Sequence, residues 1–186
     1  MYWEKPGKSN TDRTLELALQ RALERGIKHV VVASCSGATA DKLVGKGVQL
    51  ICVTHHVGFA GSGNDEMGEK MRRHLQNQGV KVLTTTHLLA GVDRACRIKF
   101  GGVYPAEIMA QTLRMLGQGV KVATEAAVMA LDAGLIPHGQ EVIAVGGTVE
   151  GADAAIVVLP AHSNMVFDTE IREIICMPRR KKPEGA

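Results

Sequence analysis

A short run of small and hydroxyl-bearing residues has the composition of a phosphate-binding loop. It follows an apolar, β-branched run at residues 29–33, which is typical of a buried parallel strand, and it precedes a short helix predicted at about residues 39–44. Such a turn presents free backbone N–H groups toward one point, and glycine lets a ligand approach the backbone closely. The candidate binding residues are Ser34, Cys35, Ser36, Gly37, Ala38 and Thr39. An ordinary strand-to-helix turn capped by Ser or Thr has the same pattern, and the sequence leaves both interpretations open.

Three histidines could supply acid–base chemistry or metal ligands. His55 and His56 begin a long glycine-rich loop after an apolar run, and His87 follows the next such run. Histidine titrates near neutral pH, so one of the three could act as a general base. No carboxylate or thiol spacing supports a metal site, so none is expected. Polar loop histidines without a special role are the alternative.

Two further residues have a chemical and a structural interpretation. Cys35 could be activated by a helix N-terminus, but a small buried hydrophobe is the favoured interpretation. Glu125 stands on an otherwise apolar predicted helix and could be a functional buried acid. The more common role is a surface acid, or the partner of an arginine such as Arg97 or Arg114.

The composition excludes several classes of function. Of 186 residues, 45% are hydrophobic and only 3% aromatic, which suits one aliphatic core and argues against single-stranded nucleic acid as a partner. Basic residues at 179–182 supply more than the net charge of +3, so the body is nearly neutral and nucleic-acid binding is not expected. No apolar run approaches the roughly 20 residues of a membrane span, and no membrane partner is expected.

The cysteines and the chain ends predict location and domain organisation. The four cysteines form no C-x-x-C pair, and the first residues are too polar for a signal peptide. A reduced, cytoplasmic protein is therefore expected. We expect one domain over residues 1–178, followed by a basic flexible tail over residues 179–186.

Apolar periodicity and glycine stops predict an alternation of helices and strands. Strands are expected at about residues 29–33, 49–54, 80–84, 141–145, 154–159 and 171–176, the last near an edge. Helices are expected from about residue 11 to Gly26, at 39–44, from a cap at Asn64 or Asp65 to 77, and at 89–96, 105–116 and 120–133. This order predicts a three-layer α/β/α sandwich with a mostly parallel, mixed sheet. The helix at 120–133 is apolar nearly all round, which places it between layers or in a subunit interface.

The lengths of the connections predict where the loops meet. The link between the strands at 141–145 and 154–159 is too short for a crossover helix, so the second of these strands should run antiparallel. Right-handed crossovers bring the C-terminal ends of the other strands to one edge, where ligands bind. Asp153 should lie at that edge and His162 at the opposite one. The remaining candidate binding residues at the ligand edge are Thr54, His55, Gly58, Thr86, His87, Gly146, Gly147, Thr148 and Asp153.

The converging groups favour an anion held mainly by backbone amides. They are hydroxyls, glycines and histidines with few cations, which does not suit an arginine clamp. No G-x-G-x-x-G pattern follows residues 29–33, and no Walker motif occurs in the sequence. We therefore set aside NAD dehydrogenases and P-loop enzymes.

One stretch resembles the C-terminal α/β domain of pyruvate kinase. Residues 30–40, Val-Val-Val-Ala-Ser-Cys-Ser-Gly-Ala-Thr-Ala, are followed by Leu-Ile-Cys-Val-Thr at residues 50–54. In pyruvate kinases the matching turn grips the phosphate of an allosteric effector, and the residues that match it are Ser34, Ser36, Gly37 and Thr39. The rest of the chain departs from pyruvate kinase and has no catalytic barrel, so the kinase reaction is not expected.

Nearly the whole chain is similar to a group of stand-alone proteins, found mostly in archaea and some bacteria. The similar segments are residues 99–108, 117–122, 146–148 and 160–164. Members of this group share the fold and are associated with flavin mononucleotide (FMN). The resemblance therefore implies a mixed sheet with its last core strand antiparallel, and the FMN phosphate as the ligand of residues 34–39.

Three functions are compatible with these observations. The first, which we favour, is binding of a phosphorylated small molecule, with FMN ahead of a sugar phosphate. The second is an enzyme in the same pocket, which uses flavin redox chemistry or a histidine acting on a phosphorylated metabolite. The third is a regulatory or scaffold homo-oligomer without catalysis, with the helix at 120–133 in a subunit interface. A homo-oligomer is the expected assembly.

Overall fold

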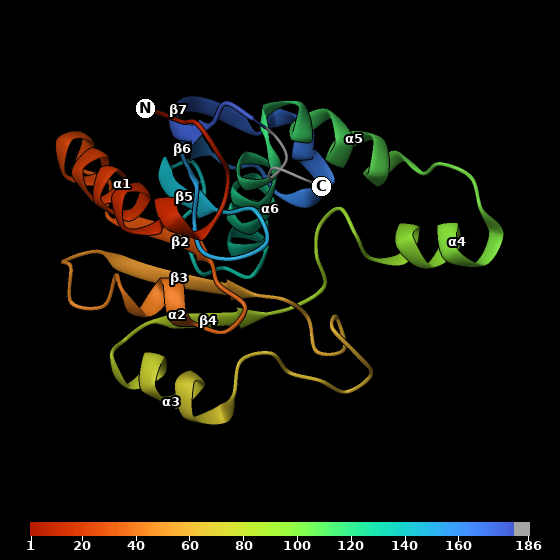
Figure 1. The fold of residues 1–186 in the computed structure, drawn as a ribbon, viewed down its shortest axis with the longest axis horizontal. Helices are drawn as coiled ribbons and strands as arrows, with labels where there is room; N and C mark the ends of the chain where they lie inside the picture. Colours follow the sequence, from red (N-terminus) through yellow and green to blue (C-terminus); the bar gives the residue numbers. More distant parts are fainter. Residues whose placement is uncertain (181–186) are drawn as a thin grey trace.

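The apolar runs of the sequence form the inner strands of one sheet, which has seven strands within the described part of the chain (Figure 1). The computed structural model describes residues 1–180 and orders the strands β1-β7-β6-β5-β2-β3-β4. The inner strands are buried on both faces, which requires continuous apolar sequence. The strands are β1 (Tyr2–Trp3), β2 (His29–Ala33), β3 (Gln49–Thr54), β4 (Lys81–Thr84), β5 (Val142–Gly146), β6 (Ala154–Leu159) and β7 (Glu170–Pro178).

The strand directions agree with the prediction from connection length. β2 pairs in parallel with β3 and β5, and β3 pairs in parallel with β4. β6 runs antiparallel to β5, because the link between them is too short for a crossover. β7 runs antiparallel to β6, and β1 lies parallel beside it. β7 is therefore one strand in from the edge, and β1, which was not predicted, forms that edge.

Glycine and proline end and begin helices as predicted. α1 (Thr11–Arg25) stops at Gly26, whose left-handed conformation (φ 66°) closes the helix. Pro105 is the first residue of α5 (Pro105–Leu113). The other helices are α2 (Ala38–Asp41), α3 (Glu69–Asn77), α4 (Val92–Phe100) and α6 (Gln118–Asp132), and the 3₁₀ turns are η1 (Lys8–Asn10), η2 (Arg114–Leu116) and η3 (Ser163–Asp168).

Several helix boundaries differ from the prediction, and α4 also ends at Phe100 instead of about residue 96. α3 begins at Glu69, because Asp65 Oδ1 accepts a hydrogen bond from the Met67 N–H (3.0 Å) and makes a turn of its own. α4 begins at Val92 instead of about residue 89, because Leu89 is buried and its N–H donates to Glu125 Oε1 (2.9 Å). α2 is a single turn that ends at Asp41.

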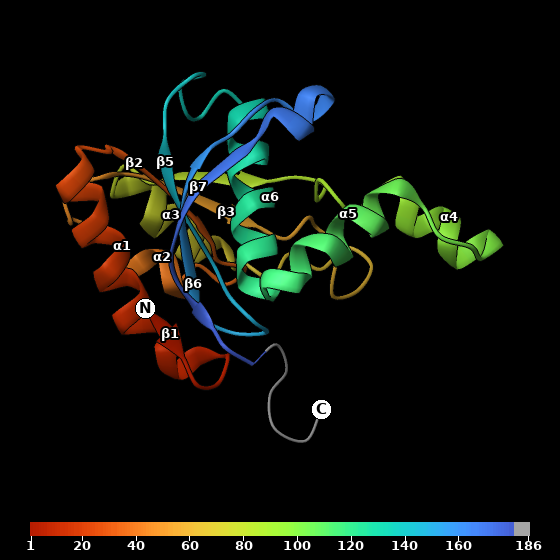
Figure 2. The same ribbon diagram turned by 90° about the horizontal axis from the view of Figure 1, so that it is seen from above.

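Helices cover both faces of the sheet, which confirms the α/β sandwich (Figure 2). Alternate side chains of a strand point to opposite faces. Val30 and Val32 therefore pack with Leu15 of α1 and Leu75 of α3, while Val31 joins a second cluster built around α6. The two clusters form the core on the two sides of the sheet.

Helix α6 is buried by its own chain. Twelve of its residues are buried, and it packs against the strands at the centre of the sheet. The expectation that this helix lies between layers is correct. It offers little surface for a subunit interface, so this helix no longer supports an oligomer.

Helices α4 and α5 project away from the body of the protein (Figures 1 and 2). We call residues 92–116 the arm. In the described structure no residue of α4 is buried. The arm carries seven exposed large apolar side chains, namely Val92, Ile98, Phe100, Val103, Ile108, Met115 and Leu116.

The two ends of the described chain lie side by side. The Met1 ammonium donates to the Ile175 carbonyl (2.8 Å), and the Arg179 N–H donates to the Trp3 carbonyl (2.8 Å). Arg179 was expected to begin a flexible tail, but it continues the pairing of β7 with β1. The other residues of the predicted tail lie largely outside the described residues. Within residues 1–180 every helix is too short or too polar to cross a membrane.

Candidate functional site

A cleft of about 2010 Å³ lies where the predicted loops converge. Its walls are the loops after β2, β3, β4 and β5, together with α6 and the arm. The predicted binding residues that line it are Ser34, Cys35, Ser36, Ala38, Thr39, Thr54, His55, His87, Gly147 and Thr148. The predicted residues that do not line it are Gly37, Gly58, Thr86, Gly146 and Asp153. His162 lies at the opposite edge, beyond the end of β6, as expected.

Three of the predicted glycines are required by packing within the protein, and one of them, Gly147, would place a Cβ 2.2 Å from the Gly151 carbonyl oxygen. A Cβ on Gly37 would lie 2.5 Å from Met71 Cγ, and its φ of 86° also favours glycine. A Cβ on Gly146 would lie 2.2 Å from the Gly119 carbonyl oxygen, at the contact between β5 and α6. Gly37 and Gly146 let α3 and α6 approach the sheet. This packing explains the glycine at position 37 without a ligand.

Asp153 reaches the predicted edge but faces away from the cleft. Its N–H donates to the Gly146 carbonyl (3.1 Å), which places it beside the end of β5. Its Oδ2 accepts a hydrogen bond from the Gly7 N–H, and its carbonyl accepts one from Trp3 Nε1 (both 2.8 Å). Burial raises the pKa of Asp153, and hydrogen bonds to the carboxylate oppose that shift. The residue fastens the N-terminal segment, a role that strand order alone does not predict.

The loop at residues 34–39 combines a capped turn with free backbone donors. Ser34 Oγ accepts a hydrogen bond from the Thr39 N–H (3.1 Å), so this hydroxyl caps the turn, as in the alternative interpretation. Within residues 1–180 the N–H groups of Ser36 and Ala38 donate no backbone hydrogen bond, while the Cys35 N–H faces its own thiol; all three residues line the cleft. The loop therefore offers unpaired N–H donors beside an open space.

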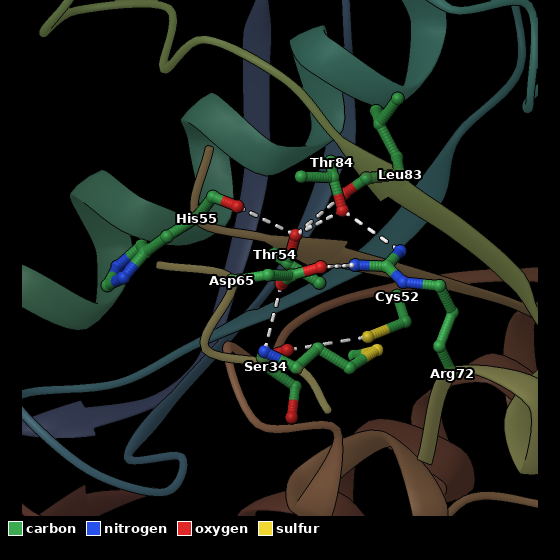
Figure 3. Close-up of polar contacts among 9 residues, drawn as sticks. Ser34, Cys52, Thr54, His55, Asp65, Arg72, Leu83 and Thr84 are labelled. Atoms are coloured by element: carbon green, nitrogen blue, oxygen red, sulfur yellow. Dashed lines mark hydrogen bonds and ion pairs between the residues drawn. The ribbon is translucent and has the colours of Figure 1, made fainter. Parts of the chain in front are cut away.

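A hydrogen-bond network fixes the strand ends beneath the cleft (Figure 3). Thr54 Oγ1 lies 2.7 Å from Thr84 Oγ1, which joins the ends of β3 and β4. Arg72 of α3 donates to Thr84 Oγ1 (3.1 Å) and to Asp65 Oδ2 (2.7 Å), and this pairing lowers the pKa of Asp65. Cys52 Sγ donates to the Ser34 carbonyl (3.5 Å). The Thr54 hydroxyl is thus part of the framework that holds the loops.

The three predicted histidines meet in a cluster of rings with Phe59. The centroid of the His55 ring lies 3.9 Å from that of Phe59 and 5.0 Å from that of His87, and His56 lies 5.4 Å from His87. Arg94 of the arm lies over the Phe59 ring (5.5 Å). Burial, with the nearby histidines, lowers the pKa of His87 to about 4, so its imidazole is neutral at physiological pH.

Cys35 and His55 lie beside a carboxylate that the sequence pattern did not connect with them. His55 Nδ1 lies 2.6 Å from Glu66 Oε2, and one donor atom each of Cys35, His55 and Glu66 lies within 4.8 Å of the others. Burial and the charge of Glu66 raise the pKa of the Cys35 thiol. The thiol is therefore protonated at neutral pH in the protein as described, which disfavours its activation by a helix N-terminus.

A buried ion pair on α6 lines the inner wall of the cleft. Lys121 Nζ donates to Glu125 Oε2, and the two side chains are 6% and 5% exposed. Glu125 Oε1 also accepts the Leu89 N–H. Burial lowers the pKa of Lys121, and the Glu125 carboxylate opposes that shift. Glu125 is thus a buried acid paired with a lysine, and its i,i+4 spacing from Lys121 on an apolar helix was the signal that sequence reasoning missed.

The comparison with known families agrees with this fold. Residues 12–158 match the pyruvate kinase, alpha/beta domain family. The chain belongs to this family. The matched region of the pyruvate kinase alpha/beta domain contains β2–β5, all of β6 but Leu159, and the loops after β2, β3, β4 and β5, while β1 and β7 lie outside it.

The cleft of this pyruvate kinase alpha/beta domain contains more positive charge than expected. Arg97 and Arg114, proposed as partners of Glu125, instead contact Glu107 and Gln118. Arg114, Arg94 and Lys121 all line the cleft, and the first two have no carboxylate partner among residues 1–180. The cleft therefore adds cationic side chains to the amides of the loop, and six acidic residues line it as well.

Proposed function

We propose that this protein binds a phosphate-bearing small molecule in the cleft, with its phosphate at residues 34–39. The observation that carries the proposal is the pair of unpaired N–H groups on Ser36 and Ala38, which line the cleft. Backbone N–H groups without a protein partner beside an open space are suited to phosphate oxygens. Arg94 and Arg114 of the same cleft add positive charge that a dianion would neutralise.

FMN is the ligand that we propose first. The group of stand-alone proteins that this chain resembles is associated with FMN, and the cleft offers features that suit its two ends. A flat aromatic ring system could stack on Phe59, whose ring is partly exposed beside His55 and His87. The phosphate loop adjoins this ring cluster, since Cys35 lies next to His55. Bound FMN would supply hydride or electron transfer.

Absorption spectroscopy of the purified protein, with mass spectrometry of the released small molecules, tests this proposal. After incubation with FMN, we expect a flavin band that stays with the protein on gel filtration. Ser36→Asp should weaken FMN binding at least tenfold, because two like charges about 4 Å apart repel by about 1–4 kcal/mol. Ser163→Asp, at the opposite edge of the sheet, is the control. Equal FMN affinity in Ser36→Asp and the unsubstituted protein would refute the assignment of the loop.

An enzyme in the same cleft is the second candidate, because three imidazole rings lie beside the proposed phosphate site. A histidine there could transfer a proton to or from a bound phosphorylated metabolite. His87→Ala should then reduce turnover by a larger factor than it weakens FMN binding. Turnover that is the same with and without the imidazole would remove His87 from the chemistry.

We also propose that the protein is a homo-oligomer held together by the arm. An isolated nine-residue helix is marginal in water, and the contacts of α4 with Ala106, Glu107 and Phe59 leave every one of its residues unburied in the described structure. Seven exposed apolar side chains, at roughly 100 Å² each, approach the ~800 Å² per partner of a stable interface. A second copy of this chain is the partner that we propose, because a two-fold axis lets each arm cover the other.

Light scattering of the protein eluting from gel filtration tests the oligomer. We expect a mass at least twice that of the chain, and Phe100→Asp should convert it to a monomer, because a charge would be buried in the interface. Leu23→Asp, at an apolar residue of α1 that is more exposed than Phe100, is the control and should leave the mass unchanged. A monomeric mass at all protein concentrations would refute the proposal.

A further inference from the structure

Three side chains with different donor atoms meet at the floor of the cleft. Cys35 comes from the loop after β2, His55 from the loop after β3, and Glu66 from the segment that precedes α3. One sulfur, one nitrogen and one oxygen atom lie within 4.8 Å of one another. All three side chains are half-buried and line the cleft, so solvent and a ligand can reach them.

This donor set matches the preferences of a particular class of metal. Thiolate, imidazole and carboxylate are all ligands of zinc, whereas the hard cations magnesium and calcium select oxygen ligands. Three protein ligands with a fourth position left to water or substrate are the usual arrangement of a catalytic zinc site. Here the fourth ligand would come from the cleft, because the three side chains line it.

We propose that Cys35, His55 and Glu66 form a binding site for a divalent transition-metal ion, with zinc as the first candidate. No ion is needed for the proposed phosphate binding, so this site goes beyond that function. The thiol releases its proton to solvent when the metal binds, and the charges of the thiolate and the carboxylate balance that of the divalent ion.

The residue that precedes each proposed ligand is held by the network of Figure 3. Ser34, next to Cys35, accepts from Cys52 and donates its N–H to the Val53 carbonyl (2.9 Å). Thr54, next to His55, is bonded to Thr84. The third, Asp65, is paired with Arg72 and precedes Glu66 in the sequence. The network therefore fixes the backbone beside all three ligands, which is the support that a preorganised metal site requires.

Only a small movement would convert the cluster to a coordinated site. Zinc–ligand bonds of about 2.0–2.3 Å in a tetrahedron separate the ligand atoms by roughly 3.3–3.8 Å. His55 Nδ1 and Glu66 Oε2 are 2.6 Å apart, so they would separate by about 1 Å. The thiol would approach by a similar amount, within the reach of a side-chain rotation.

Titration of the chelator-treated full-length protein with Co²⁺ tests the site. Co²⁺ can replace zinc in such sites, and its absorption spectrum depends on the number and type of the bound ligands. We expect one equivalent to bind, with the visible bands of tetrahedral Co²⁺ and a near-ultraviolet thiolate-to-cobalt band. Competition with a chromophoric zinc chelator then gives the Zn²⁺ affinity. Cys35→Ser should abolish the thiolate band and weaken Zn²⁺ binding by at least the 10–100-fold that loss of an outer-shell partner causes.

Matched variants separate this site from other cysteines and acids. Cys96→Ser removes a half-buried thiol from the arm, and Glu69→Gln removes an exposed carboxylate from the start of α3. Both should bind metal like the unsubstituted protein, while Glu66→Gln should bind more weakly. Circular dichroism checks that each variant is folded. Absence of saturable binding by the folded protein would overturn the proposal, and so would a thiolate band that survives in Cys35→Ser.

Discussion

Replacing Glu125 with glutamine should lower the free energy of unfolding by about 3–5 kcal/mol, because it leaves the buried Lys121 ammonium without a counter-charge. Glutamine is nearly the same size and keeps a carbonyl oxygen for the Leu89 N–H, so the variant mainly removes the charge. For a chain of this length, each kcal/mol changes the melting temperature by about 2–4 °C. The expected decrease is therefore about 6–20 °C.

Urea denaturation followed by circular dichroism measures this change, and pH provides a second test. Burial lowers the pKa of Lys121, and Arg94 and Arg114 lower it further, while Glu125 opposes them. Without Glu125 the pKa should fall again. In the folded variant Lys121 then loses its proton at a lower pH than in the unfolded chain, where it stays protonated up to pH about 10.5. The difference in free energy of unfolding between the variant and the unsubstituted protein should therefore become smaller as the pH rises toward that value.

An exposed ion pair with the same spacing supplies the control. Glu69 and Arg73 of α3 are also four residues apart, but their side chains are 65% and 73% exposed. Glu69→Gln should change the free energy of unfolding by less than about 0.5 kcal/mol. Adding Lys121→Met to the Glu125→Gln variant should recover stability, because it removes the unpaired ammonium. A Glu125→Gln variant as stable as the Glu69→Gln control would refute the reasoning.

Two further predictions concern the framework of the site. Gly146→Ala should destabilise the protein by at least about 1–3 kcal/mol, because its Cβ would meet the Gly119 carbonyl, whereas Gly68→Ala has open space and should be nearly neutral. Urea denaturation compares the two variants. Burial raises the pKa of Asp153 above its ordinary 3.8. The folded state therefore loses stability as the pH rises from 3.8 to the raised pKa, because Asp153 ionises more readily in the unfolded chain. Asp153→Asn should therefore gain stability relative to the unsubstituted protein between pH 4 and 7, and a constant difference across this range would contradict the argument.

The layers and strand directions could be predicted because local rules determine them. A seven-residue link cannot cross over a sheet, so the antiparallel direction of β6 followed from residues 147–153 alone. Gly26 and Pro105 ended and began helices through their own backbone preferences. The convergence of residues 34–39, His55 and His87 at one edge followed from the handedness of crossovers.

Side-chain direction could not be predicted, because it depends on neighbours that are distant in sequence. Asp153 is at the predicted edge, yet its carboxylate accepts a hydrogen bond from the Gly7 N–H and does not line the cleft. Glu66 reaches His55 because Asp65 forms a turn that delays α3. A short strand such as β1 has only two residues and no periodicity to detect, so only its pairing with β7 reveals it.

The pairing of β1 with β7 also sets the order in which the fold can be completed during synthesis. The contact between Met1 and Ile175 spans 174 residues, so β1 can pair only after β7 has been synthesised. Closing so long a loop is entropically unfavourable and slow, whereas the parallel strands β2–β5 can pair earlier. A nascent chain that stalls before residue 170 would therefore leave one edge of the apolar strand β6 unpaired, as a template for association with other chains.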